Sequence, residues 1–570
     1  MVNVKRVWVA MIFCVAACQA APSSPIITQS PNLLPADTSP TLTPFQPIPW
    51  TATPGSTSEL PESSTATQSV PTLTPEVPTP NSNPFSLYID PNLEPSILPV
   101  LQLPADLALT DDPNAANLEI FIGEDYPISQ WVYALVAPFP TVTDDISARD
   151  LRAAWNGESR GDFGGIPLMM TESTLGVLSA FWGSPAEEAV RVRSSDKLLA
   201  TAWEQRPSWA IIPFEELDPR WKVLSIGGIS PIHKDFNPAD YELAIPISMT
   251  GAAPEHPQIP ASNRDPEKLT ILAMTGVTAL VRATAYTMEQ QGNTYPAKDI
   301  GPILRAADIT HISNEVPFAQ DCPYPNPTQE DMRFCSRTKY IELLEDVGTD
   351  IVELTGDHFA DWGAEAMYYT LDLYDQLGWP YYGGGANFKE GRQAAIIEDH
   401  GNKLAFIGCN AKGGGFATAS ASNPGAVSCD WEWMQAEVRR LRAEDYLPIA
   451  TFQHFEYYTY VAQPNQIRDA ERMTEAGAVI VSGSQAHQPQ AFEFSNGSLV
   501  HHGLGNLFFD QLDVSEATRQ GFIDLHVFYN GRHISTELVT IYFVDYARAR
   551  LMNPQERAAL LSAVFSASGW

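Results

Sequence analysis

Acidic, amide and histidine side chains recur directly after strand-like segments in the second half of this sequence. These side chains are Asn314, Glu315, Asp357, His358, His454 and His487. Residues that follow neighbouring strands of an open α/β sheet meet at one edge of the sheet, where ligands bind. Carboxylates and imidazoles gathered there can bind a divalent metal ion of hard or borderline character. The pattern therefore predicts a metal site built from Glu315, Asp357, His454 and His487.

Such a site would carry out hydrolysis or group transfer. Two metal ions about 3.5–4 Å apart can clamp a phosphoryl group or polarise an amide, and they generate hydroxide at neutral pH. Glu315, Asp357 and Glu456 would repel one another without a cation, so a bound ion would also stabilise the cluster.

The segments that must position these residues alternate between strand-like and helix-like, which predicts an α/β domain. The strand-like segments span 269–275, 308–313, 350–356, 403–409, 447–452 and 478–483, with later ones near 498–503, 523–529 and 536–544. The helix-like segments span 296–306, 337–346, 363–377, 432–443, 465–476 and 553–570. Each predicted ligand then lies at the end of a strand.

The preceding part of the chain is expected to form a smaller α/β domain. Strand-like and helix-like runs alternate there, at 118–123, 131–140, 146–157, 194–205 and 209–214. The runs DLRAAWNG at 150–157 and AIIPFEEL at 210–217, with Thr171–Thr174 between them, resemble part of a periplasmic solute-binding protein of the phosphate- or molybdate-binding type. The sequence leaves open whether this domain binds a solute or binds nothing.

Residues 269–510 carry motifs of a known family in the right order. They read LTGDHFADWG at 354–363, QHFEYY at 453–458, GSQAHQPQ at 483–490 and HHGLGNLFFD at 501–510. This series resembles the capsule synthesis protein CapA family, which is linked to poly-γ-glutamate. The resemblance implies a calcineurin-like metallophosphatase fold, a β-sandwich flanked by helices. The expected fold class is thus α/β, with this sandwich preceded by a smaller lobe like that of a solute-binding protein.

The resemblance also implies roles for single residues. It makes His358 the catalytic residue that protonates a leaving group, while a water on the bound ion acts as the nucleophile. It also implies that Arg282, Asn314 and Asn506 contact the substrate, or that Asn506 instead supports the site from behind. The protein would then be a metal-dependent hydrolase or transferase that makes or processes a capsule or envelope polymer of the poly-γ-glutamate type.

The sequence departs from the family pattern at positions that matter for metal binding. Gly276 stands where the family has a metal-binding Asp, and Ser484 and Gln485 stand at histidine positions. These changes favour one bound ion rather than two, and they do not distinguish Mn, Zn and Fe. The alternative is a non-catalytic lipoprotein that binds a surface polymer or solute and retains a degenerate metal site.

The N-terminus has the pattern of an export signal. Lys5 and Arg6 precede an apolar stretch at 7–17, which is too short to span a bilayer as a permanent helix. The stretch ends in VAAC, and Cys18 then resembles the acylated cysteine of a bacterial lipobox. A plain secretory signal is the alternative. Lipidation would place the protein on the extracytoplasmic face of a bacterial cell membrane.

The expected domain organisation follows from these segments. It comprises a signal peptide and lipobox at 1–18, a disordered Pro/Ser/Thr-rich linker at 19–84, the solute-binding-like domain at 85–250, an interdomain linker at 251–267 and the CapA-like domain at 268–570. A linker rich in proline acts as a semi-stiff spacer between the membrane and the folded domains.

The remaining cysteines fall into two close pairs. We predict the disulfides Cys322–Cys335 and Cys409–Cys429, which suit an exported protein. Buried thiols or a zinc site are the alternatives, although the CxxC spacing typical of structural zinc is absent from the sequence.

The charge of the chain limits its partners. It has 34 Lys and Arg against 68 Asp and Glu, a formal net charge of −34. Nucleic-acid binding is disfavoured because it requires a basic surface. Contact with the membrane is expected through the N-terminal lipid only. The expected partners are an envelope polymer or small-molecule ligand, together with other capsule-export proteins.

Overall fold

The computed structural model describes residues 85–570. The predicted signal segment, Cys18 and the Pro/Ser/Thr-rich linker lie outside the described residues. Within residues 85–570, every helix is too short or too polar to cross a membrane.

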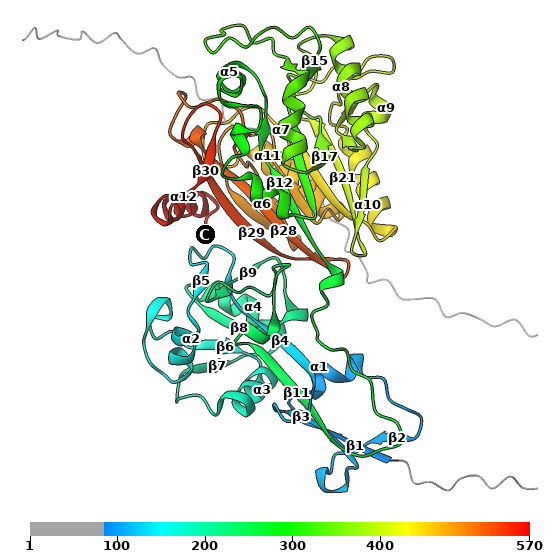
Figure 1. Ribbon diagram of the computed structural model, residues 1–570, viewed down its shortest axis with the longest axis vertical. Helices are drawn as coiled ribbons and strands as arrows, with labels where there is room; N and C mark the ends of the chain where they lie inside the picture. Colours follow the sequence, from blue (N-terminus) through cyan, green and yellow to red (C-terminus); the bar gives the residue numbers. More distant parts are fainter. Residues whose placement is uncertain (1–84) are drawn as a thin grey trace, which may run out of the picture. The chain divides into compact units, whose positions relative to one another are not determined.

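The first part of the described chain forms a nine-stranded mixed sheet (Figure 1). The strands lie in the order β2-β1-β3-β11-β4-β8-β6-β7, with β9 beside β4. They are β1 (Phe85–Ile89), β2 (Leu107–Leu109), β3 (Leu118–Ile122), β4 (Pro127–Pro138), β6 (Leu168–Met170), β7 (Val190–Val192), β8 (Trp209–Pro213), β9 (Trp221–Val223) and β11 (Ala244–Gly251). Strand β11 lies antiparallel to both β3 and β4.

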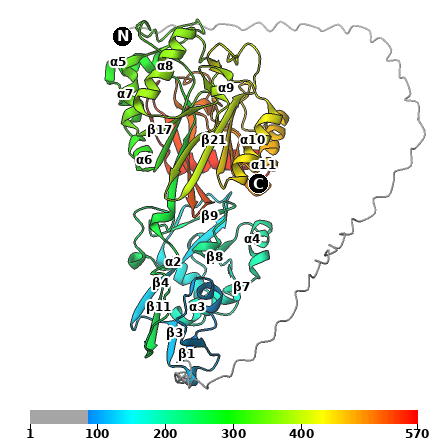
Figure 2. The same ribbon diagram turned by 90° about the vertical axis from the view of Figure 1, so that its right-hand side faces the viewer.

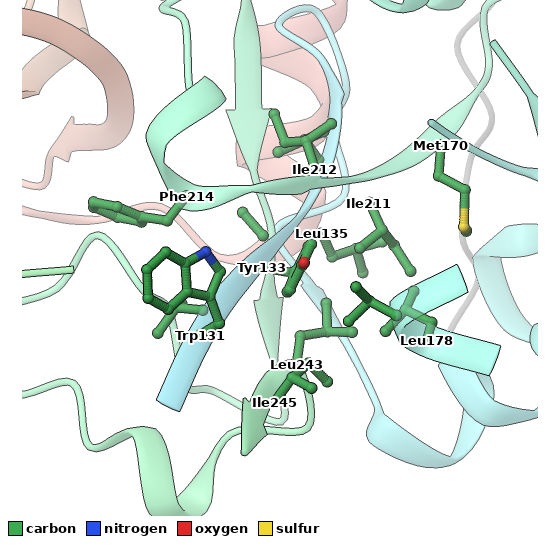
Figure 3. Close-up of a cluster of buried hydrophobic side chains, with 14 of the residues drawn as sticks. Trp131, Tyr133, Leu135, Met170, Leu178, Ile211, Ile212, Phe214, Leu243 and Ile245 are labelled. Atoms are coloured by element: carbon green, nitrogen blue, oxygen red, sulfur yellow. The ribbon is translucent and has the colours of Figure 1, made fainter. Parts of the chain in front are cut away.

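Three helices of two turns or more cover this first sheet: α2 (Ala148–Trp155), α3 (Glu172–Trp182) and α4 (Ser195–Glu204), and the short α1 (Glu94–Ile97) adds Ile97 to the same core. Ser147 and Thr171 begin α2 and α3 by accepting backbone N–H groups of the first turn. Apolar side chains of β4 and β8 form the core with Leu178 of α3, as Figure 3 shows. The expected alternation of strands and helices in this region is present.

The second part of the chain contains two larger sheets. One has nine strands, with a main path β18-β17-β14-β12-β28-β29-β30, and the other has six, in the order β20-β21-β23-β24-β26-β25. The strands of the first are β12 (Leu269–Thr275), β13 (Val277–Thr278), β14 (Ile309–Asn314), β17 (Thr349–Glu353), β18 (Tyr381–Tyr382), β27 (Asn506–Phe508), β28 (Gln520–Tyr529), β29 (Arg532–Phe543) and β30 (Ala549–Leu551). Those of the second are β20 (Ala395–Asp399), β21 (Asn402–Asn410), β23 (Leu447–Gln453), β24 (Ile480–Ser482), β25 (Phe492–Ser495) and β26 (Ser498–His501).

The two sheets pack face to face, with helices on both outer sides. Consecutive residues face opposite layers: Ile449 packs between the sheets and Ala450 packs under the helices α10 (Trp431–Ala443) and α11 (Pro464–Ala476). On the other side α6 (Gly301–Ala306), α7 (Ile341–Asp346) and α8 (Ala364–Leu377) pack on the first sheet. Figure 2 shows the strands between these two helical layers. The predicted fold class, a β-sandwich flanked by helices and preceded by a smaller α/β lobe, is confirmed.

Some elements differ from the sequence-based expectation. Helix α5 (Arg282–Gln291) was not expected, and the segments predicted as helices at 296–306 and 337–346 each begin with a short 3₁₀ turn that precedes a shorter α-helix. The C-terminal helix α12 (Pro554–Ala567) begins where Asn553 and Glu556 cap each other's backbone N–H groups.

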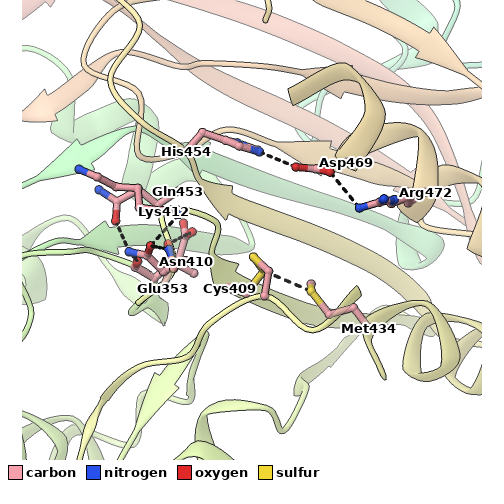
Figure 4. Close-up of a disulfide and its surroundings, with 12 residues drawn as sticks. Glu353, Cys409, Asn410, Lys412, Met434, Gln453, His454, Asp469 and Arg472 are labelled. Carbon is pink, nitrogen blue, oxygen red and sulfur yellow. Dashed lines mark hydrogen bonds and ion pairs between the residues drawn. A yellow bond between two sulfur atoms is a disulfide. The ribbon is translucent and has the colours of Figure 1, made fainter. Parts of the chain in front are cut away.

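Two disulfides are present in the second part of the chain. They join Cys322 to Cys335 and Cys409 to Cys429. Cys409 lies on β21, and Cys429 directly precedes Asp430, the N-cap residue of α10. The second disulfide therefore ties the end of a central strand to the start of a covering helix (Figure 4).

Replacing both Cys409 and Cys429 by serine should lower the free energy of unfolding by about 3 kcal/mol, because the cross-link restricts the unfolded chain. Urea denaturation of the full chain measures this loss. Serine replacement of Cys322 and Cys335 is the matched control, and a slightly smaller loss is expected because the sequence separation is 13 rather than 20. An unchanged unfolding midpoint in the first variant would contradict the prediction.

Candidate functional site

The loops after two neighbouring parallel strands bring Glu315, Asp357 and His358 together. Glu315 follows β14, and the other two residues follow β17. The two strands are in register near their ends, where Ser313 pairs with Glu353. One potential ligand atom from each of the three site residues lies within 4.8 Å of the others. The first sheet thus positions three of the predicted site residues at one edge.

Glu315 is the most deeply buried of these acids, with 1% of its surface exposed. Its Oε1 atom has no hydrogen-bond partner among residues 85–570. Burial raises the pKa of Glu315 to about 8, and the nearby charges of Asp357 and Glu456 act in the same direction. A buried carboxylate oxygen without a partner is unfavourable, and a cation would satisfy it.

His358 is oriented by a neighbouring carboxylate. Its Nδ1 donates to Oδ2 of Asp361 at 2.7 Å, and its ring packs on Phe334 with centroids 5.0 Å apart. Burial disfavours the charged imidazolium, but Asp361, Glu315 and Asp357 outweigh it and raise the pKa of His358 to about 9. The hydrogen bond at Nδ1 leaves Nε2 as the nitrogen that can exchange a proton or bind an ion.

Both oxygens of Asp357 already have partners. Gln453 donates to Oδ1 at 2.6 Å, and the ammonium of Lys412 donates to Oδ2 at 2.5 Å. Lys412 also donates to Glu456 at 2.8 Å. Sequence reasoning missed Lys412 and Gln453 as site residues. The signal that could have found Lys412 is its position three residues after the predicted strand 403–409.

His487 lies next to the cluster. Its Nε2 is 3.9 Å from Oε1 of Glu315, and its Nδ1 is 2.9 Å from Oδ1 of Asn506. Asn506 is fully buried and also donates to the carbonyl of His487. The structure therefore places Asn506 behind His487, as a residue that orients the ring, rather than where a substrate could reach it.

The structure does not bring His454 into the cluster. Its Nε2 lies 3.2 Å from Oδ2 of Asp469 on α11, and Asp469 is also bound by Arg472. Figure 4 shows His454 directed to Asp469, away from Gln453 and Lys412. Side chains alternate across a strand, so Gln453 at the end of β23 faces Asp357 and the next residue faces the helices. The expectation that His454 shares the site with Glu315 is corrected accordingly.

Arg282 and Asn314 are both held by neighbouring side chains. Arg282 pairs with Asp510 at 2.6 Å, and its guanidinium lies over the ring of Phe509, which in turn contacts His487. Asn314 is fully buried and donates to the hydroxyl of Tyr374 at 2.8 Å. The buried Asn314 therefore supports its neighbours instead of meeting a substrate, whereas the contact of the partly exposed Arg282 with substrate stays a prediction.

At the positions where the family pattern has further ligands, this chain has close backbone packing or uncharged side chains that donate hydrogen bonds. A Cβ atom at Gly276 would lie 1.9 Å from the carbonyl oxygen of Gly505. Ser484 donates to the buried carboxylate of Glu353, and Gln485 donates to a serine of β14 at 2.6 Å.

A second acidic group lies at the opposite ends of the strands. Asp308, Asp399 and His400 have ligand atoms within 4.8 Å of one another. Asp308 accepts from the backbone of Ile271, and Asp399 is bonded to both His400 and Thr270. These acids are already engaged in hydrogen bonds that join strands.

A β-sandwich between helical layers, with acids and histidines gathered after its parallel strands, defines a metallophosphatase-like domain. Residues 270–511 match the model of the family described as bacterial capsule synthesis protein PGA_cap. The resemblance to the capsule synthesis family is thereby confirmed for this segment.

Two curated proteins named CapA share modest identity with the chain. It is 23% identical over 257 residues to the capsule biosynthesis protein CapA of Bacillus anthracis, covering 44% of this chain and 62% of that protein. It is 26% identical over 227 residues to the PGA biosynthesis protein CapA of Bacillus subtilis, covering 39% of this chain and 59% of that protein. The matches thus span about three fifths of each relative's length.

Solved structures similar to parts of the chain include a 5'-nucleotidase precursor from Thermus thermophilus, with 13% identity and a TM-score of 0.32, covering 52% of this chain and 58% of that one. An ABC-type phosphate transport receptor from Vibrio cholerae has 10% identity and a TM-score of 0.24, covering 30% of this chain and 88% of that one.

Proposed function

We propose that this chain is a lipid-anchored protein of the extracytoplasmic face that makes or processes a capsule or envelope polymer of the poly-γ-glutamate type. Its second domain would act as a metal-dependent hydrolase or transferase, in contact with other capsule-export proteins. The family match over residues 270–511 supports the capsule role, and the lipobox-like Cys18 supports the anchor.

The observation that carries the catalytic proposal is the unpartnered Oε1 of Glu315, buried beside two histidines. Carboxylates and an imidazole form a donor set suited to a divalent ion such as Mn, Zn or Fe. Glu315 and His487 have donor atoms left for the ion, Asp357 lies beside them, and His358 keeps its Nε2 for proton transfer. The residues therefore fit a single ion.

When bound, a divalent ion supplies polarisation of a phosphoryl or amide oxygen and activation of water. The protein's own residues then complete the reaction. Asp361 holds the ring of His358 so that Nε2 can hand a proton to the leaving group. Asn506 fixes the orientation of His487 by binding its Nδ1, which is the usual way in which a ligating imidazole is held.

Replacing Glu315 by glutamine should abolish binding of a divalent ion and any hydrolysis, because the amide keeps the shape of the carboxylate and removes its charge. Metal content of the purified full chain measures the first effect, and turnover of poly-γ-glutamate and of a phosphodiester measures the second. The fold should be retained, since an uncharged side chain is easier to bury than a carboxylate.

Glu398→Gln, at an exposed position on β20, is the matched control and should leave both metal content and turnover unchanged. Undiminished turnover in Glu315→Gln, or after exhaustive chelation of the wild-type protein, would overturn the proposal. A wild-type protein that binds polymer but holds no metal would instead favour a non-catalytic surface lipoprotein, which the loss of the ligand at Gly276 already makes the second candidate.

A further inference from the structure

The ammonium group of Lys412 lies between two acids at the edge of the site. Its Nζ is 2.5 Å from Oδ2 of Asp357 and 2.8 Å from Oε1 of Glu456. The side chains of Lys412 and Asp357 are each 5% exposed, and that of Glu456 is 26% exposed. A lysine is rarely buried to this extent unless it is paired. The two carboxylates therefore depend on a positive charge at this point.

Several contacts hold Lys412 in place. Its backbone N–H donates to Oδ1 of Asn410, and the amide of Asn410 donates to Gln453, which in turn binds Asp357. Figure 4 shows Lys412, Asn410 and Gln453 gathered together. The Nζ atom also lies 4.6 Å from the ring centroid of Phe416, a distance typical of a cation–π contact. The ammonium is thus fixed before any ligand arrives.

A divalent ion and an ammonium group are both cations that can bridge two carboxylates at this point. Either one bridges the oxygens of two facing carboxylates and reduces their mutual repulsion, although the ion carries twice the charge of the ammonium and only the ion can polarise a substrate strongly. The chain has Gly276 where the family pattern has a metal-binding Asp, and the close approach of Gly505 leaves no room for a side chain. The chain thus lacks one ligand of the family pattern and has a buried lysine paired with two acids of the site.

We propose that the ammonium of Lys412 permanently occupies one of the two cation positions of the metallophosphatase-like site, by bridging Asp357 and Glu456. The remaining position, beside Glu315, is then the only one that a metal ion can fill, and this part of the inference rests on the proposed function. The site becomes a mixed centre with one fixed organic cation and one exchangeable divalent ion.

The test is the number of Mn²⁺ ions bound per full chain, measured by elemental analysis and calorimetry, in the wild-type protein and in Lys412→Ala. The variant exposes the Asp357 and Glu456 oxygens, so it should bind one ion more than the wild type, with an affinity at least about tenfold above that of any second site in the wild type. The midpoint of thermal unfolding should also rise more steeply with Mn²⁺ in the variant. Lys412→Arg keeps the charge and should behave as the wild type.

The outcomes separate this inference from the proposed function. No ion in the wild type and one in Lys412→Ala would support the inference and refute the proposed function. One ion in both proteins would overturn the inference and agree with the proposed function. Two ions in the wild type, or none in either protein, would overturn the inference.

Two further variants keep the test valid if Lys412→Ala is insoluble. Lys412→Gln is neutral but retains two N–H donors for the acids, so it should fold and gain the additional ion. Lys403→Ala removes an exposed lysine from β21, the strand that precedes Lys412, and should change neither stoichiometry nor thermal midpoint. An unchanged ion count in a folded Lys412→Gln protein would overturn the inference as clearly as the alanine variant.

Discussion

Gly276→Asp, which introduces the residue that the family pattern has at this position, should destabilise the domain instead of restoring a metal ligand. The Cβ atom would lie 1.9 Å from the carbonyl oxygen of Gly505, and that oxygen already accepts the N–H of Val277. The position of a Cβ atom is fixed by the backbone, and its contact is a backbone oxygen, so no side-chain rotation can relieve the clash. We expect a loss of at least about 3 kcal/mol in the free energy of unfolding, measured by urea denaturation.

Gly276→Ala is the control that separates sterics from charge. The clash arises at Cβ, so alanine should lose nearly as much stability as aspartate, and neither variant should gain metal. A Gly276→Asp protein that is as stable as the wild type and binds an additional ion would contradict this account. It would show that the chain at Gly276, between β12 and β13, can move away from Gly505.

Asp510→Ala should be the second strongly destabilising change. The carboxylate of Asp510 accepts from Arg282 at 2.6 Å and from the backbone N–H groups of Ala283 and Thr284 at the start of α5. Its side chain is 5% exposed and that of Arg282 is 22% exposed. Removal leaves a guanidinium without its partner and a helix start without its acceptor. We expect a loss of about 3–5 kcal/mol in urea denaturation.

Asp510→Asn provides the graded control, because its amide oxygen can still accept one N–H group while the charge is lost. It should be destabilised less than Asp510→Ala. Equal losses in the two variants would show that the ion pair with Arg282 accounts for the whole effect. The hydrogen bonds at the start of α5 would then contribute nothing measurable. A loss below about 1 kcal/mol in Asp510→Ala would contradict the prediction.

The sequence was sufficient to predict the sandwich, because strand-like and helix-like segments alternate along residues 268–570 and because the motifs occur in the family's order. It was also sufficient to bring Glu315, Asp357 and His358 together, since each directly follows a strand. The prediction for His454 was made by the same criterion and failed, because position after a strand does not determine which layer a side chain faces.

The supporting residues were harder to predict for a different reason. Lys412 belongs to no motif, and its two acidic partners are 55 and 44 residues away in the sequence, so only the folded chain shows the contact. Asn314 and Asn506 do belong to motifs, but a motif does not reveal burial. Both side chains are fully buried, where they hold neighbours in place instead of meeting a substrate.

The opposite orientation of Gln453 and His454 has a consequence for comparing this chain with its relatives. A relative whose strand is one residue shorter before the same motif would direct the histidine, and not the glutamine, toward the acid at position 357. A single-codon deletion could therefore exchange an imidazole for an amide in this environment without altering any motif letter. Alignments of such proteins must preserve strand length to the residue before ligand identities are transferred.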